Sequence, residues 1–152
     1  MPYYQTKTYR SSGGASSNDS YISEYVAGKH LGRMQFRAYQ YLHVKTNIPC
    51  QSYMLFFTAT GYIYGNGNIH STIGCYPYNN TIINIFANNN ANASIDTAYA
   101  SSDYYCCLRF NRGSTGYTEG VFDLILSGHN KSDYESFGIT NWTLTNSASN
   151  QY

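Results

Sequence analysis

The fold is decided by Ser52-Tyr53-Met54-Leu55-Phe56-Phe57-Thr58-Ala59-Thr60-Gly61-Tyr62-Ile63-Tyr64, followed by Gly65-Asn66-Gly67-Asn68. Aromatic and β-branched residues favour extended backbone, so Ser52 to Tyr64 is the longest strand candidate. The Gly/Asn run after it supplies residues that tolerate the positive φ angles of a tight turn, and therefore predicts a hairpin. Both faces of the strand carry apolar residues. This pattern indicates a central strand or a strand at a face between subunits.

Shorter strand candidates lie on both sides of this stretch. Met34, Phe36 and Ala38 alternate with polar neighbours, the run continues from Tyr39 to Thr46, and Asn47-Ile48-Pro49 is expected to break it. The later candidates are Ile69 to Tyr76 (ending at Pro77), Thr81 to Phe86, Tyr104 to Phe110, Gly120 to Ser127 and Ile139 to Leu144. Polar loops are expected at Asn88 to Asn92 and at Asn111 to Gly116.

Helical signals are weak throughout the sequence, because no ten-residue window carries an apolar stripe with caps. Seven or eight short strands with regular turns predict an all-β fold, an antiparallel β-sandwich or jelly-roll-like knob. A strand that is apolar on both faces could be buried between subunits, so we expect a homotrimer.

The first 23 residues differ from the rest, because they lack hydrophobic periodicity. Ser11 to Ser20 is rich in Ser and Gly and predicts a flexible linker. The segment before it contains Tyr3, Tyr4 and Tyr9 and alternates enough to form a strand or docking peptide on a partner. We therefore expect an attachment segment with its linker at residues 1–23 and a knob domain at residues 24–152. A frayed terminus without a role is the alternative.

The chain is weakly charged and rich in tyrosine. Charged residues make up 11% of it and the formal net charge is +1, whereas a typical soluble protein is about 25% charged. Electrostatic capture of nucleic acid is therefore a poor explanation, and the close group Lys29, Arg33 and Arg37 is better interpreted as a solvated or subunit-pairing face. The 18 tyrosines, together with abundant Asn and Ser, suit an uncharged surface that contacts sugars or neighbouring subunits.

Targeting signals are not apparent. No apolar segment follows Met1, and the longest apolar runs are too short to span a bilayer, so we expect no membrane insertion. A surface of extracellular type without an export signal favours a virion component that is made in the host cytoplasm.

The cysteines Cys50, Cys75, Cys106 and Cys107 contain no C-x-x-C pair. We expect four buried free thiols, with a disulfide from Cys50 or Cys75 to one of the adjacent pair as the alternative.

Patterns for catalysis and metal binding are weak. His43 and Cys50 form the one Cys/His pairing worth weighing, and a polar strand position explains His43 more simply. One histidine from each chain of a trimer, His43 or His70, could meet around a metal ion on the axis. The two carboxylates of a glycosidase could come from among Asp96, Asp103, Glu119, Asp123, Asp133 and Glu135, although any β protein with eight acids offers such pairs. We therefore expect a protein that is not an enzyme, with no catalytic residue, metal or cofactor.

Three motifs carry a resemblance to a known family. They are His43-Val44-Lys45-Thr46-Asn47, then Met54 to Phe57 leading into Gly61-Tyr62-Ile63-Tyr64-Gly65, and then Tyr99-Ala100-Ser101-Ser102-Asp103-Tyr104-Tyr105. Through these motifs roughly residues 39 to 145 resemble the C-terminal knob of tail fibres from marine phages, cyanophages especially. The resemblance implies a trimeric β-sandwich knob that contacts the host surface.

These observations together predict a fibre or receptor-binding protein, exposed on the tail or capsid surface of a virion. Its expected partners are itself as a homotrimer, another virion protein through the N-terminal segment, and a host glycan or receptor. The residues expected to contact the receptor are Tyr76, Tyr78, Asn79, Asn80, Asn88, Asn89, Asn90 and Tyr117. The alternatives are a capsid or tail decoration protein docked by its N-terminal segment, and a short polysaccharide hydrolase.

Overall fold

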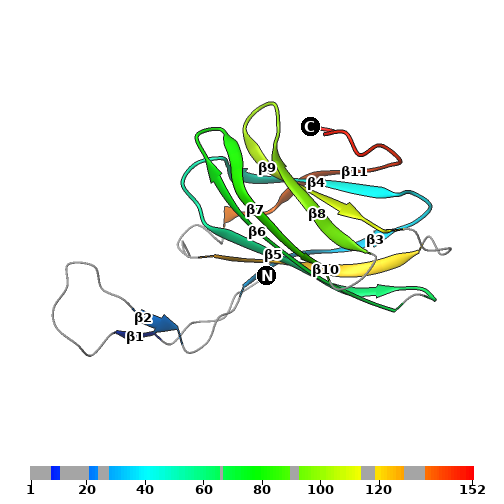
Figure 1. The fold of residues 1–152 in the computed structure, drawn as a ribbon, viewed down its shortest axis with the longest axis horizontal. Coiled ribbons are helices and arrows are strands. Elements are labelled where there is room, and N and C mark those ends of the chain that lie inside the picture. Colours follow the sequence, from blue (N-terminus) through cyan, green and yellow to red (C-terminus); the bar gives the residue numbers. More distant parts are fainter. Residues whose placement is uncertain are drawn as a thin grey trace.

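The structure is a computed structural model, and it describes residues 8–10, 21–23, 28–65, 67–89, 93–113, 119–128 and 136–152. Every regular element in these ranges is a strand (Figure 1). The strands are β1 (Thr8–Arg10), β2 (Tyr21–Ser23), β3 (Lys29–Phe36), β4 (Tyr41–Pro49), β5 (Leu55–Ile63), β6 (Gly67–Tyr78), β7 (Thr81–Asn89), β8 (Ser94–Ala100), β9 (Tyr105–Asn111), β10 (Gly120–Gly128) and β11 (Ile139–Thr145). A search of the described residues for a helix able to cross a membrane found none.

Two antiparallel sheets make up the main body (Figure 1). The larger has the order β3-β10-β5-β6-β7 and the smaller has the order β11-β4-β9-β8. β1 and β2 pair with each other in a separate two-stranded sheet. The prediction of an all-β antiparallel fold is therefore confirmed, and the two layers are consistent with a β-sandwich.

Side chains from both sheets meet in one core. Phe36 on β3 and Phe122 on β10 pack against Phe110 on β9, with ring centroids 5.2 and 4.4 Å from that of Phe110. The same core contains aliphatic residues such as Val44 and Ile73, which are almost fully buried. Burying so much apolar surface is the main favourable term that holds the two layers together.

β5 is a central strand, as the sequence predicts, because β10 pairs with one side of it and β6 with the other. Leu55, Phe57 and Ala59 point into the core, whereas Phe56 and Tyr62 are exposed on the outer face. The apolar character of both faces therefore has two different causes. One face is core, and the other is an apolar surface on the outside of the five-stranded sheet.

Several strand boundaries differ from those expected. The run from Met34 to Thr46 is interrupted, because Ala38 adopts a positive φ of 70° between β3 and β4. The predicted break at Asn47-Ile48-Pro49 is wrong, since β4 continues to Pro49 and Ile48 is fully buried in the core. Proline is tolerated there because a register irregularity precedes it and it is the last residue of the strand. β8 was not predicted, because Ser94 to Ala100 lacks a clear alternation.

The predicted hairpin turn between β5 and β6 is confirmed, with positive φ angles at Gly65 and Gly67. The next hairpin, between β6 and β7, turns on Asn79 and Asn80, whose φ angles are 50° and 64°. Two successive residues with positive φ define the type I′ turn, which matches the twist of antiparallel strands and for which Asn is one of the few suitable residues.

The four cysteines are buried and free, which confirms the prediction. Cys106 lies in the core beside Cys75, and Cys107 points to the opposite face of β9. Burial raises the pKa of the Cys107 thiol to about 12, so this thiol stays protonated and unreactive at neutral pH.

Candidate functional site

The outer face of β5, β6 and β7 exposes large apolar side chains. Met54, Phe56 and Phe86 have exposed fractions of 52%, 53% and 72%. We call this surface the aromatic face, and its residues are Met54, Phe56, Tyr76, Tyr78, Ile83 and Phe86. Single exposed apolar residues are ordinary, but a contiguous group on one sheet face is typical of a binding surface.

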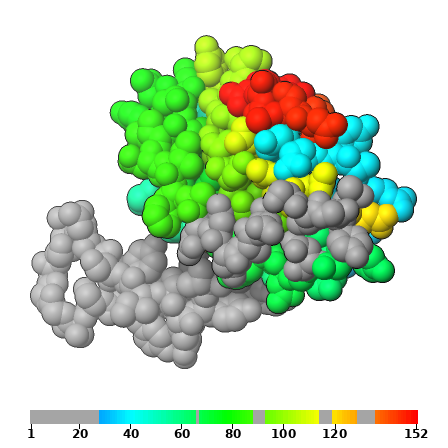
Figure 2. Space-filling view, turned by 45° about the vertical axis from the view of Figure 1, so that its right-hand side comes forward, coloured from blue at the N-terminus to red at the C-terminus, as the bar shows by residue number. Residues whose placement is uncertain are grey.

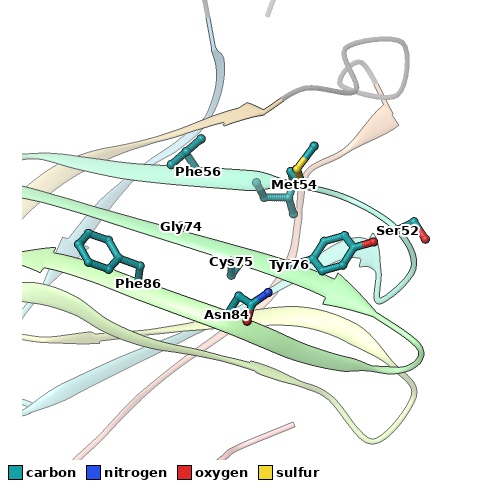
Figure 3. A pocket seen from close by; sticks show the side chains of 9 residues that line it. Ser52, Met54, Phe56, Gly74, Cys75, Tyr76, Asn84 and Phe86 are labelled. Carbon is teal, nitrogen blue, oxygen red and sulfur yellow. The ribbon is translucent and has the colours of Figure 1, made fainter. Parts of the chain in front are cut away.

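A pocket of about 690 Å³ opens within the aromatic face (Figure 3). Phe56 and Phe86 lie at one end of it, and Tyr76 and Ser52 lie at the other. The complete lining is Ser52, Met54, Leu55, Phe56, Gly74, Cys75, Tyr76, Asn84 and Phe86. This volume falls within the range of roughly 300–1,000 Å³ that is common for small-molecule sites.

The pocket exists because of a missing side chain and an irregular strand. Gly74 lies opposite Phe56 on β5, and a Cβ added to it would come 3.3 Å from the Phe56 ring. On β7 the register with β6 shifts between Gly74 and Tyr76, and Asn84 has a positive φ of 52°. This is the geometry of a β-bulge, which bends an edge strand and redirects its side chains. The bulge and the glycine together leave the space that the aromatic rings surround.

Four of the eight predicted contact residues lie together beside this pocket. Tyr76 lines it, and Tyr76 and Tyr78 stack with ring centroids 5.4 Å apart and planes only 11° apart. Asn79 and Asn80 form the turn that follows, and the backbone amide of Asn80 donates a hydrogen bond of 2.9 Å to the Cys50 carbonyl. The backbone conformation of the two asparagines therefore explains why they are there, independently of any ligand.

The other predicted contact residues do not join this group. Asn88 and Asn89 were expected in a loop, but they lie in β7, where they pair with Thr72 and Ser71 at the other end of the strand from the turn. The loop prediction is wrong there because the β6–β7 ladder extends beyond the apolar run. Asn90 and Tyr117 lie outside the described residues.

The attachment segment is only partly described. Tyr9 is in β1 and pairs with Ile22 of β2, while Tyr3 and Tyr4 lie outside the described ranges. The attachment role of these tyrosines stays a prediction.

Most of the residues that line the pocket could not be identified as a site from the sequence. Met54, Phe56 and Phe86 were assigned to apolar strands, and Gly74 and Asn84 were not singled out. The useful signal was the apolar pattern on both faces of Tyr53 to Tyr64. One of these faces is core, and the other is the exposed apolar surface that carries the pocket.

The electrostatics of the pocket are simple, because none of the described residues that line it carries a charge. The Ser52 hydroxyl, the Asn84 amide and the Tyr76 hydroxyl are the side-chain groups able to hydrogen-bond at its edge. Such a lining suits a neutral ligand that has an apolar face and a few hydroxyl groups.

The acids considered for a hydrolase that lie in the described ranges are each engaged by a basic side chain, whereas Asp133 and Glu135 lie outside those ranges. Asp123 accepts hydrogen bonds from Arg33 (3.0 and 3.1 Å) and contacts His30 at 2.9 Å, and these contacts lower its pKa to about 2. The ammonium group of Lys45 donates to both Asp103 oxygens, at 2.8 and 2.9 Å, and lowers the pKa of that carboxyl.

Glu119 completes this set of acids, because it pairs with Arg37. A glycosidase acid needs a raised pKa, so the acids of the described ranges give the hydrolase alternative no support. The pairing of Arg33 and Arg37 with acids also fits the interpretation of that basic group as a solvated face.

Metal binding gains no support within the described ranges, where no group of three or more His, Cys, Asp or Glu side chains is arranged to hold an ion. His43 does occupy a strand position, in β4, but it is fully buried. His70 is exposed on β6.

Comparisons with family models, with curated proteins and with solved structures gave no match to this chain. The resemblance to phage fibre knobs therefore stays a prediction.

Proposed function

We propose that this chain is a non-catalytic binding module that recognises a neutral carbohydrate through the pocket of the aromatic face, as the receptor-binding knob of a virion fibre. The observation that carries the proposal is an open, uncharged pocket of about 690 Å³ between Phe56, Tyr76 and Phe86.

Aromatic rings and sugars fit one another physically. A pyranose ring has a face of C–H groups that packs on an aromatic ring, while its hydroxyl groups need hydrogen-bonding partners at the edge. The Phe56 and Phe86 rings offer the apolar contact, and Tyr76 and Tyr78 form a rigid platform that loses little conformational entropy on binding. Ser52 and Asn84 lie where hydroxyl groups would meet polar partners.

Composition and fold support the placement on a virion. The weak charge and the abundance of Tyr and Asn suit contact with uncharged surfaces. The finer features belong to the same proposal: a jelly-roll-like knob, assembled as a homotrimer, joined to another virion protein through residues 1–23. Docking of that segment on a capsid or tail lattice, without receptor binding, is the structural alternative.

The proposal is tested by screening the purified chain against an array of neutral glycans, followed by calorimetry on any hit. Phe86→Ala and Tyr76→Ala remove rings that line the pocket and should abolish or strongly weaken binding. Tyr64→Ala is the matched control, because Tyr64 is about as exposed as Phe86 (67% against 72%) but does not line the pocket. An array without hits, or hits that Phe86→Ala leaves unchanged, would refute the proposal.

Light scattering on the same variants distinguishes ligand binding from self-association. A mass near three chains that drops in Phe86→Ala would identify the aromatic face as a subunit interface instead of a receptor site.

A further inference from the structure

The residues Asn146–Tyr152, which we call the C-terminal segment, lie against the four-stranded sheet. Figure 2 shows them in red beside the cyan residues of the β4 region. Three hydrogen bonds tie their backbone to side chains of that sheet. His43 contacts the Ser147 carbonyl at 3.1 Å, and Arg109 donates to the Ala148 carbonyl at 2.7 Å. The backbone amide of Gln151 donates to the Tyr99 hydroxyl at 3.3 Å.

The three side chains come from neighbouring strands of one face. His43 is on β4 and lies directly opposite Arg109 on β9, while Tyr99 is on β8, the strand beyond. The ring of His43 packs edge-on against that of Tyr99, with centroids 5.8 Å apart. The segment covers this group so completely that His43 has an exposed fraction of 0% and Tyr99 of 8%.

The partners of His43 determine its protonation. Nε2 faces a carbonyl oxygen, which only accepts, so Nε2 must carry a proton and donate. Nδ1 lies 2.9 Å from the Tyr99 hydroxyl. That oxygen already accepts from the Gln151 amide, and a neutral ring uses Nδ1 to accept the Tyr99 proton. The neutral imidazole therefore satisfies every donor and acceptor of this group.

A second proton on His43 would disrupt this arrangement of hydrogen bonds. Nδ1 would then donate, so the Tyr99 hydroxyl would have to turn its own proton away while accepting from two donors. The new positive charge would also lie, out of contact with water, near the guanidinium of Arg109.

We propose that His43, Tyr99 and Arg109 form a pH-sensitive clamp, which holds the C-terminal segment while His43 is neutral and releases it when His43 is protonated. Release uncovers the outer face of the four-stranded sheet.

The direction of the pKa supports this clamp. Burial lowers the pKa of His43 below its ordinary value, and the charge of Arg109 acts in the same direction, while the Ser147 carbonyl and Asp96 oppose it. Since the folded pKa is depressed, the unfolded or released state binds the proton more readily. The clamp is therefore fully closed above the ordinary histidine pKa of about 6.5 and opens as the pH falls below it.

Other ionisable groups share this face and must be considered. They are Tyr41 and Lys45 on β4, Asp96 and Tyr99 on β8, Tyr105, Cys107 and Arg109 on β9, Tyr152 in the segment, and Asp103, which pairs with Lys45. Burial raises the pKa of Tyr99 and of Cys107 to about 12, so both stay neutral in the acid range. Arg109 is held by both oxygens of Asp96, at 2.8 and 3.1 Å. The protonation of Asp96 is thus the main competing cause that an experiment must separate.

The test is amide hydrogen exchange of Gln151 measured by NMR in the full chain, at about pH 7.5 and about pH 4.5, corrected for the intrinsic pH dependence of exchange. The wild-type amide should be protected at the higher pH and lose that protection at the lower. His43→Gln keeps an amide donor and a carbonyl acceptor but does not titrate. In this variant the Gln151 backbone amide should therefore stay protected at both pH values. Tyr99→Phe removes the hydroxyl that accepts from the Gln151 backbone amide, so this amide should be unprotected at both pH values. His70→Gln changes an exposed histidine and should behave as the wild type.

Two results would overturn the clamp. One is wild-type protection that persists at the lower pH. The other is loss of protection in His43→Gln at the same pH as in the wild type, which would assign the response to Asp96. Should His43→Gln fail to fold, the ring resonances of His43 in the wild type decide instead. Their titration midpoint must coincide with that of Gln151 exchange, and different midpoints refute the proposal.

Discussion

The β6–β7 turn offers a direct check on why asparagine occupies positions 79 and 80. Both residues have positive φ angles of 50° and 64°. A residue with a Cβ pays roughly 1–2 kcal/mol for this conformation, and asparagine is one of the few that tolerate it, whereas glycine has no steric penalty there. Asn79→Ala with Asn80→Ala should therefore lower the free energy of unfolding by about 2–4 kcal/mol at most, while the double glycine variant should stay within about 1 kcal/mol of the wild type.

Urea denaturation followed by circular dichroism measures both variants. For a chain of this length each 1 kcal/mol corresponds to roughly 2–4 °C in Tm, so a thermal scan resolves the difference as well. If the alanine pair is as stable as the glycine pair, the turn does not impose the backbone angles described here. The glycine pair also lacks both side chains. Its glycan affinity therefore shows whether Asn79 and Asn80 touch the ligand or only shape the hairpin.

Three further predictions concern two closely packed positions and one ion pair on the surface. Phe122→Ala should lower the free energy of unfolding by about 3–5 kcal/mol in urea denaturation, because the ring is 2% exposed and stacks on Phe110 with centroids 4.4 Å apart. A decrease below about 1 kcal/mol, as expected for the exposed Phe86→Ala, would contradict the assigned core. Gly61→Ala should prevent folding or severely destabilise the chain, since its Cβ would overlap the backbone of β10, and a normal thermal transition would refute that packing. The carboxyl of Asp123 has a pKa of about 2, depressed from 3.8, so its stabilising contribution is present above pH 3.8 and is lost as the pH falls through 2. Asp123→Asn should remove that part of the acid sensitivity, measured as unfolding free energy against pH, and an unchanged slope would count against the ion pair.

The sequence revealed the strands but not what covers them. Local alternation marked β5 and β10 because each has one buried and one more exposed face. It failed at β8, where Asp96 and Thr97 interrupt the pattern at a register shift. It also gave no hint that His43 is buried, since the residues that cover it lie more than a hundred positions away.

Only part of the candidate site could be predicted from the sequence, because its residues come from different strands. Tyr76 and Tyr78 alternate on one strand, so their shared face follows from the sequence. The pocket depends on Gly74 and on the bulge at Asn84. The role of Gly74 becomes apparent only when the fold places Phe56 and Phe86 on the strands to either side of it. Sequence spacing does not encode such cross-strand neighbours.

The measurement that tests the central claim most directly is NMR chemical-shift mapping with the best neutral glycan from an array screen. The account predicts that the resonances of Met54, Phe56, Tyr76 and Phe86 shift on titration, and that Phe86→Ala abolishes the response while Tyr64→Ala retains it. Shifts confined to other surfaces, or a full response in Phe86→Ala, would contradict the assignment of the pocket as the binding site.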